Sequence, residues 1–239
     1  MTNALFAQQD AYHSLSKRGA FQSIPASMNA MQIDPANLAV SERYKLLVGA
    51  VVPRPIAFIS TIDEQGRANL APFSFFNGVS GEPMALLFCP ANKPDGSEKH
   101  TLVNVATTGQ FVVNIVSDAI ARRMAVCAED LPIGESEFAL AGLTEAPSTK
   151  VAPPRVAESP LSLECEVERI IRLAPGEPSG GNVVIGRVVF VHAADGLIDE
   201  RCRVDPAQLA AIGRMAGLTY CSTRDRFDMP WGRNALEEA

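Results

Sequence analysis

The 239-residue sequence predicts a mainly β fold with short peripheral helices, arranged as a closed, antiparallel, Greek-key-like barrel. The first observation is a β-hairpin signal: residues 54–62 carry an alternating apolar pattern, Gly66 permits the turn, and residues 68–77 restart the pattern. The second is a series of further strand-like runs at residues 84–89, 110–116, 161–173 and 182–192. With this many strands, closure is favoured because a barrel leaves no strand edge exposed.

The composition limits the classes of function. Hydrophobic residues make up 47% of the chain, enough for one full core, so we expect one main domain. A net charge of −6 and a pI near 5.2 disfavour a nucleic-acid binder, whose phosphate contacts need clustered Lys and Arg. No basic segment precedes an apolar leader core, and no apolar run is long enough to span a membrane. We therefore expect a cytoplasmic protein that binds neither nucleic acid nor membrane.

The five cysteines indicate neither a disulfide framework nor a metal site. They are odd in number and widely spaced, and they form no Cys-x-x-Cys pair and no Cys/His cluster at zinc spacing. Cys89 and Cys165 lie in apolar, strand-like contexts, which favours buried and unreactive thiols. No bound metal is expected.

Three segments are expected along the chain: an N-terminal arm at residues 1–40, the barrel domain at residues 41–230 and a C-terminal tail at residues 231–239. The arm is polar, Ala-rich and interrupted by prolines, which is typical of a flexible extension. Its larger apolar side chains equally favour an arm that packs on a partner subunit. These side chains are Leu5, Phe6, Leu15 and Phe21.

The first half of the domain is expected to begin with a strand at residues 46–52, before the hairpin. Residues 84–89 form a continuous apolar run between two prolines, as expected of a strand buried on both faces. A polar loop then leads to a short helix at residues 99–107, with Ser97 as a plausible N-cap.

The second half alternates short helices with two long strands. Ser117 or Asp118 is expected to cap a helix that ends at residue 128, and Gly186 indicates a bulge or a close approach within its strand. The other expected features are a short helix at 135–141, an irregular crossing at 144–160, a helix at 206–211 capped by Asp205, and an irregular tail from residue 213.

Two places in the sequence are suited to an anion. The second arm of the hairpin ends in Ser74, Phe75, Phe76 and Asn77, where polar groups could meet an anion and aromatic rings could flank a planar ligand. The helix that begins near Lys99 would add its positive dipole end, an ammonium group and the hydroxyl of Thr101. A flat, phosphorylated cofactor fits both places.

Other catalytic classes lack a starting residue in this sequence. There is no Gly-x-Gly-x-x-Gly, Walker loop, nucleophile elbow or His/Glu metal motif. The neutral donors around the two anion sites instead suit a protein that holds a flat, phosphorylated cofactor, which would itself carry the chemistry.

The chain resembles the flavin reductase-like family, whose members bind FMN in a split β-barrel. The resemblance rests on the segments Arg54-Pro-Ile, Ser60-Thr61, Asn69-Leu-Ala-Pro-Phe-Ser-Phe-Phe-Asn77, Lys99-His-Thr-Leu-Val-Asn104 and Phe111-Val-Val-Asn114. These segments span about a quarter of the chain, and their order and spacing are more specific than any one of them. His100 departs from the pattern, because many members carry an acidic residue there.

The resemblance implies roles for a set of residues. The FMN phosphate or ribityl chain would be contacted by Ser60 or Thr61, Ser74, Lys99 and Thr101. The flavin ring would be contacted by Asn77 and by the backbone around Phe75 and Phe76. Asn104 would add a supporting hydrogen bond. The resemblance also implies that Arg54, Pro55, Ile56 and His100 belong to the cofactor-binding set, and that Arg214 and Tyr220 close over the cofactor. His192 is the candidate catalytic residue, which would help to place a nicotinamide.

Each of these residues also has a structural alternative. Ser60 and Thr61 are compatible with ordinary strand ends, and the phenylalanines with plain core. Arg54 could bind a phosphate or pair with a surface carboxylate, and His192 could be a partly buried structural imidazole. Arg214 and Tyr220 could equally be interface residues.

The resemblance implies an NAD(P)H:flavin reductase. It would be a homodimer with FMN at the subunit interface, would take hydride from NADH or NADPH, and would supply reduced flavin to a partner such as a monooxygenase. Two alternatives remain open: a flavin-binding electron carrier that does not use NAD(P)H directly, and a split-barrel binding module without turnover.

Overall fold

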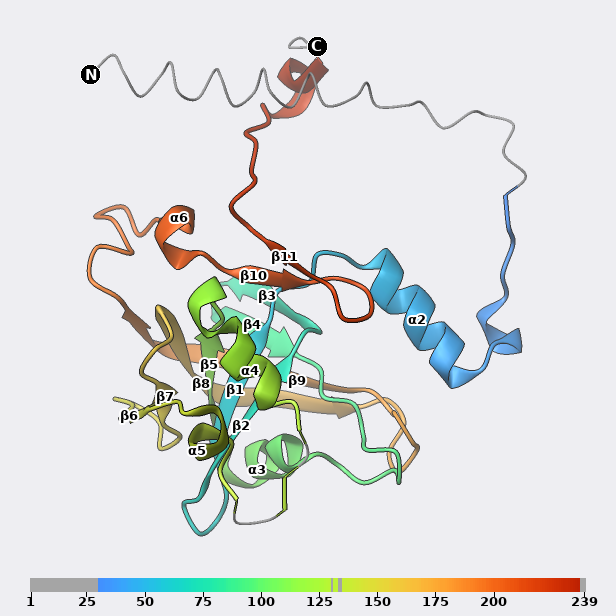
Figure 1. Ribbon diagram of the computed structural model, residues 1–239, viewed down its shortest axis with the longest axis horizontal. Helices are drawn as coiled ribbons and strands as arrows, with labels where there is room; N and C mark the ends of the chain where they lie inside the picture. Colours follow the sequence, from blue (N-terminus) through green and yellow to red (C-terminus); the bar gives the residue numbers. More distant parts are fainter. Residues whose placement is uncertain (1–29, 130, 133–134, 237–239) are drawn as a thin grey trace. The chain divides into compact units, whose positions relative to one another are not determined.

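The computed structural model describes residues 30–129, 131–132 and 135–236 (Figure 1). These residues fall into two compact units, which are described separately: Val40–Arg224, and the flanking segments 30–39 and 225–236. The flanking segments contain the 3-10 helices η1 (Pro35–Asn37) and η3 (Gly232–Leu236), and the side chain of Asp34 caps η1 through the N–H of Ala36. The apolar side chains expected in the N-terminal arm lie outside the described residues.

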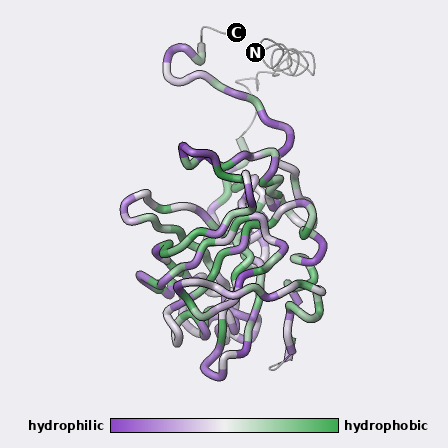
Figure 2. Tube along the Cα trace, turned by 90° about the vertical axis from the view of Figure 1, so that its left-hand side faces the viewer, coloured by the Kyte–Doolittle hydropathy of each residue, from purple (hydrophilic) through white to green (hydrophobic). Residues whose placement is uncertain are grey.

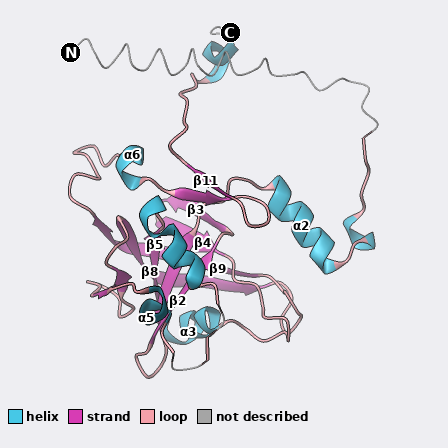
Figure 3. Ribbon diagram, viewed as in Figure 1, coloured by secondary structure: helices cyan, strands magenta, loops and turns pink. Residues whose placement is uncertain are grey.

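The centre of Val40–Arg224 is a seven-stranded antiparallel sheet (Figure 3). Its order is β2-β1-β5-β8-β9-β4-β3. The strands are β1 (Ala57–Ile62), β2 (Ala68–Phe73), β3 (Phe76–Gly81), β4 (Met84–Phe88), β5 (Gln110–Ile115), β8 (Leu161–Arg172) and β9 (Asn182–Ala193). The pairing described places β2 and β3, which are consecutive in the chain, at the two ends of the order.

The remaining elements are short and lie around this sheet. The helices are α2 (Val40–Ala50), α3 (His100–Thr108), η2 (Asp118–Ile120), α4 (Ala121–Val126), α5 (Glu137–Ala141) and α6 (Pro206–Leu209). Two small hairpins pair β6 (Glu145–Ala146) with β7 (Arg155–Val156) and β10 (Ile212–Arg214) with β11 (Tyr220–Ser222). The expected mainly β fold with short helices is confirmed.

Successive side chains of β1 point to opposite faces of the sheet. Because the residues from Ala57 to Thr61 are all buried, both faces of this strand are covered. Ile56 and Phe58 belong to a core cluster with Met124 and Phe138 from the helices α4 and α5. Ala57 and Ile59 belong to a second cluster, which contains Leu102 of α3 together with residues of β4, β5 and β9. In Figure 2 the hydrophobic segments gather among these strands, whereas several of the connecting turns are hydrophilic.

Several element predictions are confirmed in detail. Ala68–Phe73 pairs with Ala57–Ile62 as the expected hairpin, and Asp205 caps α6 through the N–H groups of Ala207 and Gln208. Gly186 marks a close approach, because a Cβ atom there would lie 2.3 Å from Cζ of Phe111. A glycine is therefore required by packing at this point of the sheet.

Three local predictions are wrong. Residues 46–50 belong to helix α2, in which Val40, Tyr44 and Leu47 recur at helical rather than strand spacing. The residue before α3 is Lys99 rather than Ser97, and its side chain makes no capping hydrogen bond. The first part of the segment from residue 213 is not irregular, because β10 and β11 form a hairpin there, whereas residues 223–231 form no helix or strand, as expected.

The segment at residues 144–160 is anchored to the sheet by buried polar side chains. Asn114 is fully buried: its Nδ2 donates to Phe58 O at 3.0 Å and to Ser60 Oγ at 3.3 Å. Its Oδ1 accepts from Val156 N and from Ser162 Oγ, both at 2.9 Å. The amide of Asn114 therefore makes four hydrogen bonds that join β1, β8 and the 144–160 segment.

A second anchor for this segment is Glu164, which is fully buried on β8. Its carboxylate accepts hydrogen bonds from the backbone N–H groups of Thr149, Lys150 and Val151, and it lies 2.5 Å from Nε2 of His192. Burial would raise the pKa of Glu164, but the His192 and backbone hydrogen bonds outweigh burial and lower it. Glu164 is therefore a structural carboxylate.

Candidate functional site

The candidate site is a set of three adjoining cavities along β2, α2, α3 and the β10–β11 hairpin. The central cavity, of about 250 Å³, runs from Lys99 and Thr101 past Phe73 to Ser74 and Phe75. The outer cavity adjoins it at Asn69, His100 and Glu137, which line both. The tail cavity adjoins it at Tyr44, Pro72 and Ser74 and extends to Arg214 and Tyr220.

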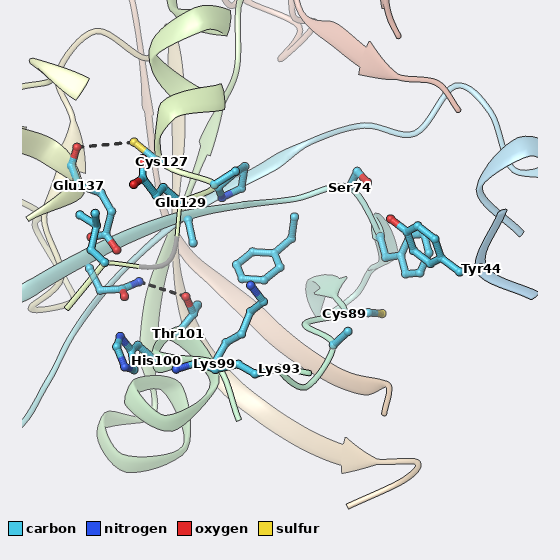
Figure 4. A pocket seen from close by; sticks show the side chains of 18 residues that line it. Tyr44, Ser74, Cys89, Lys93, Lys99, His100, Thr101, Cys127, Glu129 and Glu137 are labelled. Atoms are coloured by element: carbon cyan, nitrogen blue, oxygen red, sulfur yellow. Dashed lines mark hydrogen bonds between the residues drawn. The ribbon is translucent and has the colours of Figure 1, made fainter. Parts of the chain in front are cut away.

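One end of the central cavity is basic. Lys93, Lys99, His100 and Thr101 line it together, at the loop and first turn that begin α3 (Figure 4). Asn69 on β2 donates from Nδ2 to Oγ1 of Thr101 at 3.0 Å, which ties this strand to the helix. Cations, a hydroxyl and the N-terminal end of a helix are the donors that a phosphate group requires.

The other end of the central cavity is apolar with a few polar atoms. Pro72, Phe73 and Phe75 line it, and the ring of Tyr44 lies 6.4 Å from that of Phe75. Figure 4 shows Ser74 and Tyr44 at the end away from His100 and Thr101. A planar aromatic ligand with a phosphate tail matches this polarity.

Arg54 supports this end of the site through a network of hydrogen bonds. Its side chain is buried, and its Nη1 donates to the carbonyl oxygens of Val48 and Val51 at 2.7 Å each. Nη2 donates to Met215 O at 3.0 Å and Nε to Ser74 Oγ at 3.3 Å. The guanidinium therefore joins the end of α2, the β10–β11 hairpin and Ser74, and these bonds leave no free fork for a phosphate.

Arg214 and Tyr220 are partners across the β10–β11 hairpin. Nη1 of Arg214 donates to the Tyr220 hydroxyl and Nη2 donates to Gly217 O, and the guanidinium lies 4.5 Å from the tyrosine ring centre. Both residues line the tail cavity. They stiffen the hairpin beside Ser74.

Glu137 and Cys127 are buried near the basic end, and the partly buried Cys89 also lines the central cavity. Burial raises the pKa of Glu137 above its usual range, against the lowering effect of backbone N–H groups and of His100. Its Oε2 accepts from Leu70 N at 3.1 Å. Burial and the charge of Glu137 raise the pKa of Cys127 to about 12, and burial also raises the pKa of Cys89, so both are neutral thiols.

The structure brings together only part of the predicted residue set. Ser74, Phe75, Lys99, His100 and Thr101 line the central cavity. Arg54, Ile56, Arg214 and Tyr220 line the tail cavity, and Asn104 lines the outer cavity.

The other predicted residues lie outside these three cavities. Ser60 is fully buried and donates to Pro154 O, and Thr61 accepts from Asn104 at 3.0 Å. Asn77 is exposed on β3, and its side chain accepts from Gly78 N. Pro55, Phe76 and His192 are likewise absent from the cavity walls, and His192 faces Glu164 and the ring of Phe190.

Sequence reasoning missed Tyr44, Lys93 and Glu137 as cavity residues, and it gave Asn69 no role. Lys93 lies in a polar loop where a solvated lysine is the ordinary expectation. Glu137 and Tyr44 reach the site from helices more than 20 residues away from the anion-binding segments. Only Asn69, inside the hairpin segment, carried a signal that could have identified it.

Among the described residues, no cluster of His, Cys, Asp and Glu could hold a metal ion. In the same part of the chain, no helix is both long enough and apolar enough to cross a membrane.

The fold and the cavity define a flavin-binding class of protein, and comparison with known proteins agrees. The model of the flavin reductase like domain matches residues 48–222, and the chain belongs to this family. Membership supports a flavin as cofactor or substrate and oxidoreductase chemistry in general terms. The expected resemblance is confirmed.

Three similar proteins match most of the length of this chain. An uncharacterised protein of Halalkalibacterium halodurans is 40% identical over 201 residues, which cover 83% of this chain and 95% of the relative. Nitrilotriacetate monooxygenase component B from Bacillus cereus is 35% identical with a TM-score of 0.79, over 84% of this chain and all of the other. The 2-nitrobenzoate 2-nitroreductase NbaA of Pseudomonas fluorescens is 32% identical with a TM-score of 0.76, over 85% of this chain and 97% of the other.

Proposed function

We propose that the protein is an NAD(P)H-dependent flavin reductase that holds FMN in the central cavity. The observation that carries the proposal is the polarity of this cavity, which is basic at Lys99 and Thr101 and aromatic at Phe73 and Phe75. Similarity to a monooxygenase component supports it. The bound flavin would supply the redox chemistry, and the protein would bind and orient it.

The residues present fit FMN. Lys99, Lys93 and the Thr101 hydroxyl would hold the phosphate, with Asn69 fixing the Thr101 rotamer through its 3.0 Å hydrogen bond. Phe75 and the polar atoms of Ser74 would face the ring end. No acid or base is required for hydride transfer, so orientation is the main contribution of the protein.

The remaining predicted residues take supporting roles in this proposal. Arg54 would position Ser74, and Arg214 with Tyr220 would border the space where a nicotinamide approaches. His192, bonded to Glu164 and absent from the cavity walls, would serve the structure rather than the nicotinamide. Ser60, Thr61 and Asn104 would hold the strands behind the site.

We further propose that the protein acts as a cytoplasmic homodimer that supplies reduced flavin to a monooxygenase, and that its sheet closes as a split barrel of residues 41–230. Similarity to a monooxygenase component B supports the partner. Exposed Val79 and Met84 beside the β3 edge are consistent with coverage by a second subunit. Residues 1–40 and 231–239 would then be appendages to this domain.

The proposal is tested by steady-state turnover. NADH or NADPH oxidation is followed with added FMN, with riboflavin and, because of the similarity to a nitroreductase, with 2-nitrobenzoate. Oxidation that depends on added or bound flavin supports the reductase. Flavin binding without oxidation of either nucleotide points to an electron carrier, and the absence of both points to a binding module.

A further inference from the structure

Glu137 is a buried carboxylate in the cavity proposed to receive a phosphate. Its side chain lines both the central and the outer cavity, and the residue is only 7% exposed. Oε2 is fixed by the N–H of Leu70, so the carboxylate cannot simply rotate into water. A negative group held here opposes any anion that enters beside Lys99.

The groups around Glu137 come from several elements. His100 at the start of α3 attracts it, and Cys127 after α4 is a neutral thiol that offers no charge. In the described part of the chain, the remaining charged residues that line the central cavity are Lys93, Lys99 and Glu129, and the outer cavity adds Asp63, Glu64, Arg67, Glu135 and Glu145. The cavity therefore combines lysines that attract a phosphate with a desolvated acid that repels it.

We propose that Glu137 weakens retention of the flavin phosphate, so that FMN binds with uptake of a proton by Glu137 and remains exchangeable. This inference rests on the proposed function. The proton comes from solvent and converts the carboxylate to a carboxylic acid when the phosphate arrives. Burial has already raised the pKa of Glu137, which lowers the cost of this protonation.

A carboxylate at this position suits a flavin that leaves after reduction. A site with the lysines alone would hold the phosphate tightly, as a prosthetic group. Glu137 is thus a positioning and affinity-determining residue rather than a catalytic one, because it acts on the phosphate end and lies away from Ser74 and Tyr44 (Figure 4).

The test is calorimetry of FMN binding in buffers with different ionisation enthalpies, repeated over a series of pH values from mildly acidic to mildly alkaline. We expect the wild-type protein to take up a proton with FMN but not with riboflavin, which lacks the phosphate. Glu137→Gln keeps an oxygen acceptor for Leu70 N and should abolish most of the uptake. It should also tighten FMN binding about tenfold at the alkaline end, the equivalent of one pKa unit of coupling.

Two further variants control the interpretation. Glu129→Gln removes an exposed carboxylate from the same cavity and should change the FMN affinity by less than about twofold, because solvent screens that charge. His100→Asn should retain proton uptake. Loss of uptake in His100→Asn together with full uptake in Glu137→Gln would overturn the inference, as would a wild-type protein that binds FMN without proton exchange.

Failure of this inference differs from failure of the proposed function. A protein that binds neither FMN nor riboflavin refutes the flavin site itself. A protein that binds both, with the same affinity for FMN in the wild type and in Glu137→Gln, refutes only the role of Glu137.

Discussion

The buried amide of Asn114 allows a stability prediction worked directly from hydrogen bonds. Asn114→Leu keeps a similar volume but removes four bonds, to Phe58 O, Ser60 Oγ, Val156 N and Ser162 Oγ. At about 1 kcal/mol net for each bond, the free energy of unfolding should fall by about 4 kcal/mol. Urea denaturation followed by circular dichroism measures this loss.

Milder and matched variants make the same test quantitative. Ser162→Ala removes one of the four bonds and should cost about 1 kcal/mol. Asn77→Ala alters an exposed side chain and should stay within about 0.5 kcal/mol of the wild type. A loss below about 1 kcal/mol for Asn114→Leu, or equal losses for Asn114→Leu and Asn77→Ala, would refute the anchoring role assigned to the Asn114 amide.

Three further predictions concern the site, the core and pH. Lys99→Met should weaken FMN binding about tenfold or more while riboflavin binding stays nearly constant, by fluorescence titration; equal losses for both ligands would contradict a phosphate contact. Gly186→Ala forces a Cβ to within 2.3 Å of Phe111 and should lower the free energy of unfolding by about 1–3 kcal/mol, whereas Gly78→Ala, with nothing within 4 Å, supplies the urea-melt control. Because the pKa of Glu164 is lowered in the folded protein, its carboxylate stabilises the fold above the ordinary pKa of 4.5, and this stabilisation is lost as the pH falls through the folded pKa. Glu164→Gln should therefore flatten the loss of stability on the acid side in melts recorded against pH. An unchanged profile would contradict this contribution of Glu164.

The hairpin of β1 and β2 could be predicted from sequence because its signals are local. Ala57–Ile62 and Ala68–Phe73 are joined by a turn at Gly66, so the hairpin needs no distant information. The prediction of a strand at residues 46–52 was wrong because a short apolar stretch fits both the helical and the strand period. The helical spacing becomes decisive only when Tyr44 is included.

The site was only partly predictable, because tertiary contacts decide which polar residues face the cavity. Lys99 and Thr101 stand together in a helix start, and the sequence indicates them. From the sequence, Ser60 is equally suited to contact a ligand. In the structure its hydroxyl instead hydrogen-bonds to Asn114 and Pro154, which lie far along the chain. Glu137 could not be found, since its closeness to His100 arises only when α5 packs beside β2.

The visible absorption spectrum of the purified protein, loaded with FMN and recorded without oxygen before and after NADH or NADPH, tests the central claim most directly. The account predicts flavin bands that appear on loading and bleach when the nucleotide is added. It also predicts that Lys99→Met loads less FMN at the same concentration. A protein that takes up no flavin, or that holds flavin equally well without Lys99 and never bleaches, would contradict it.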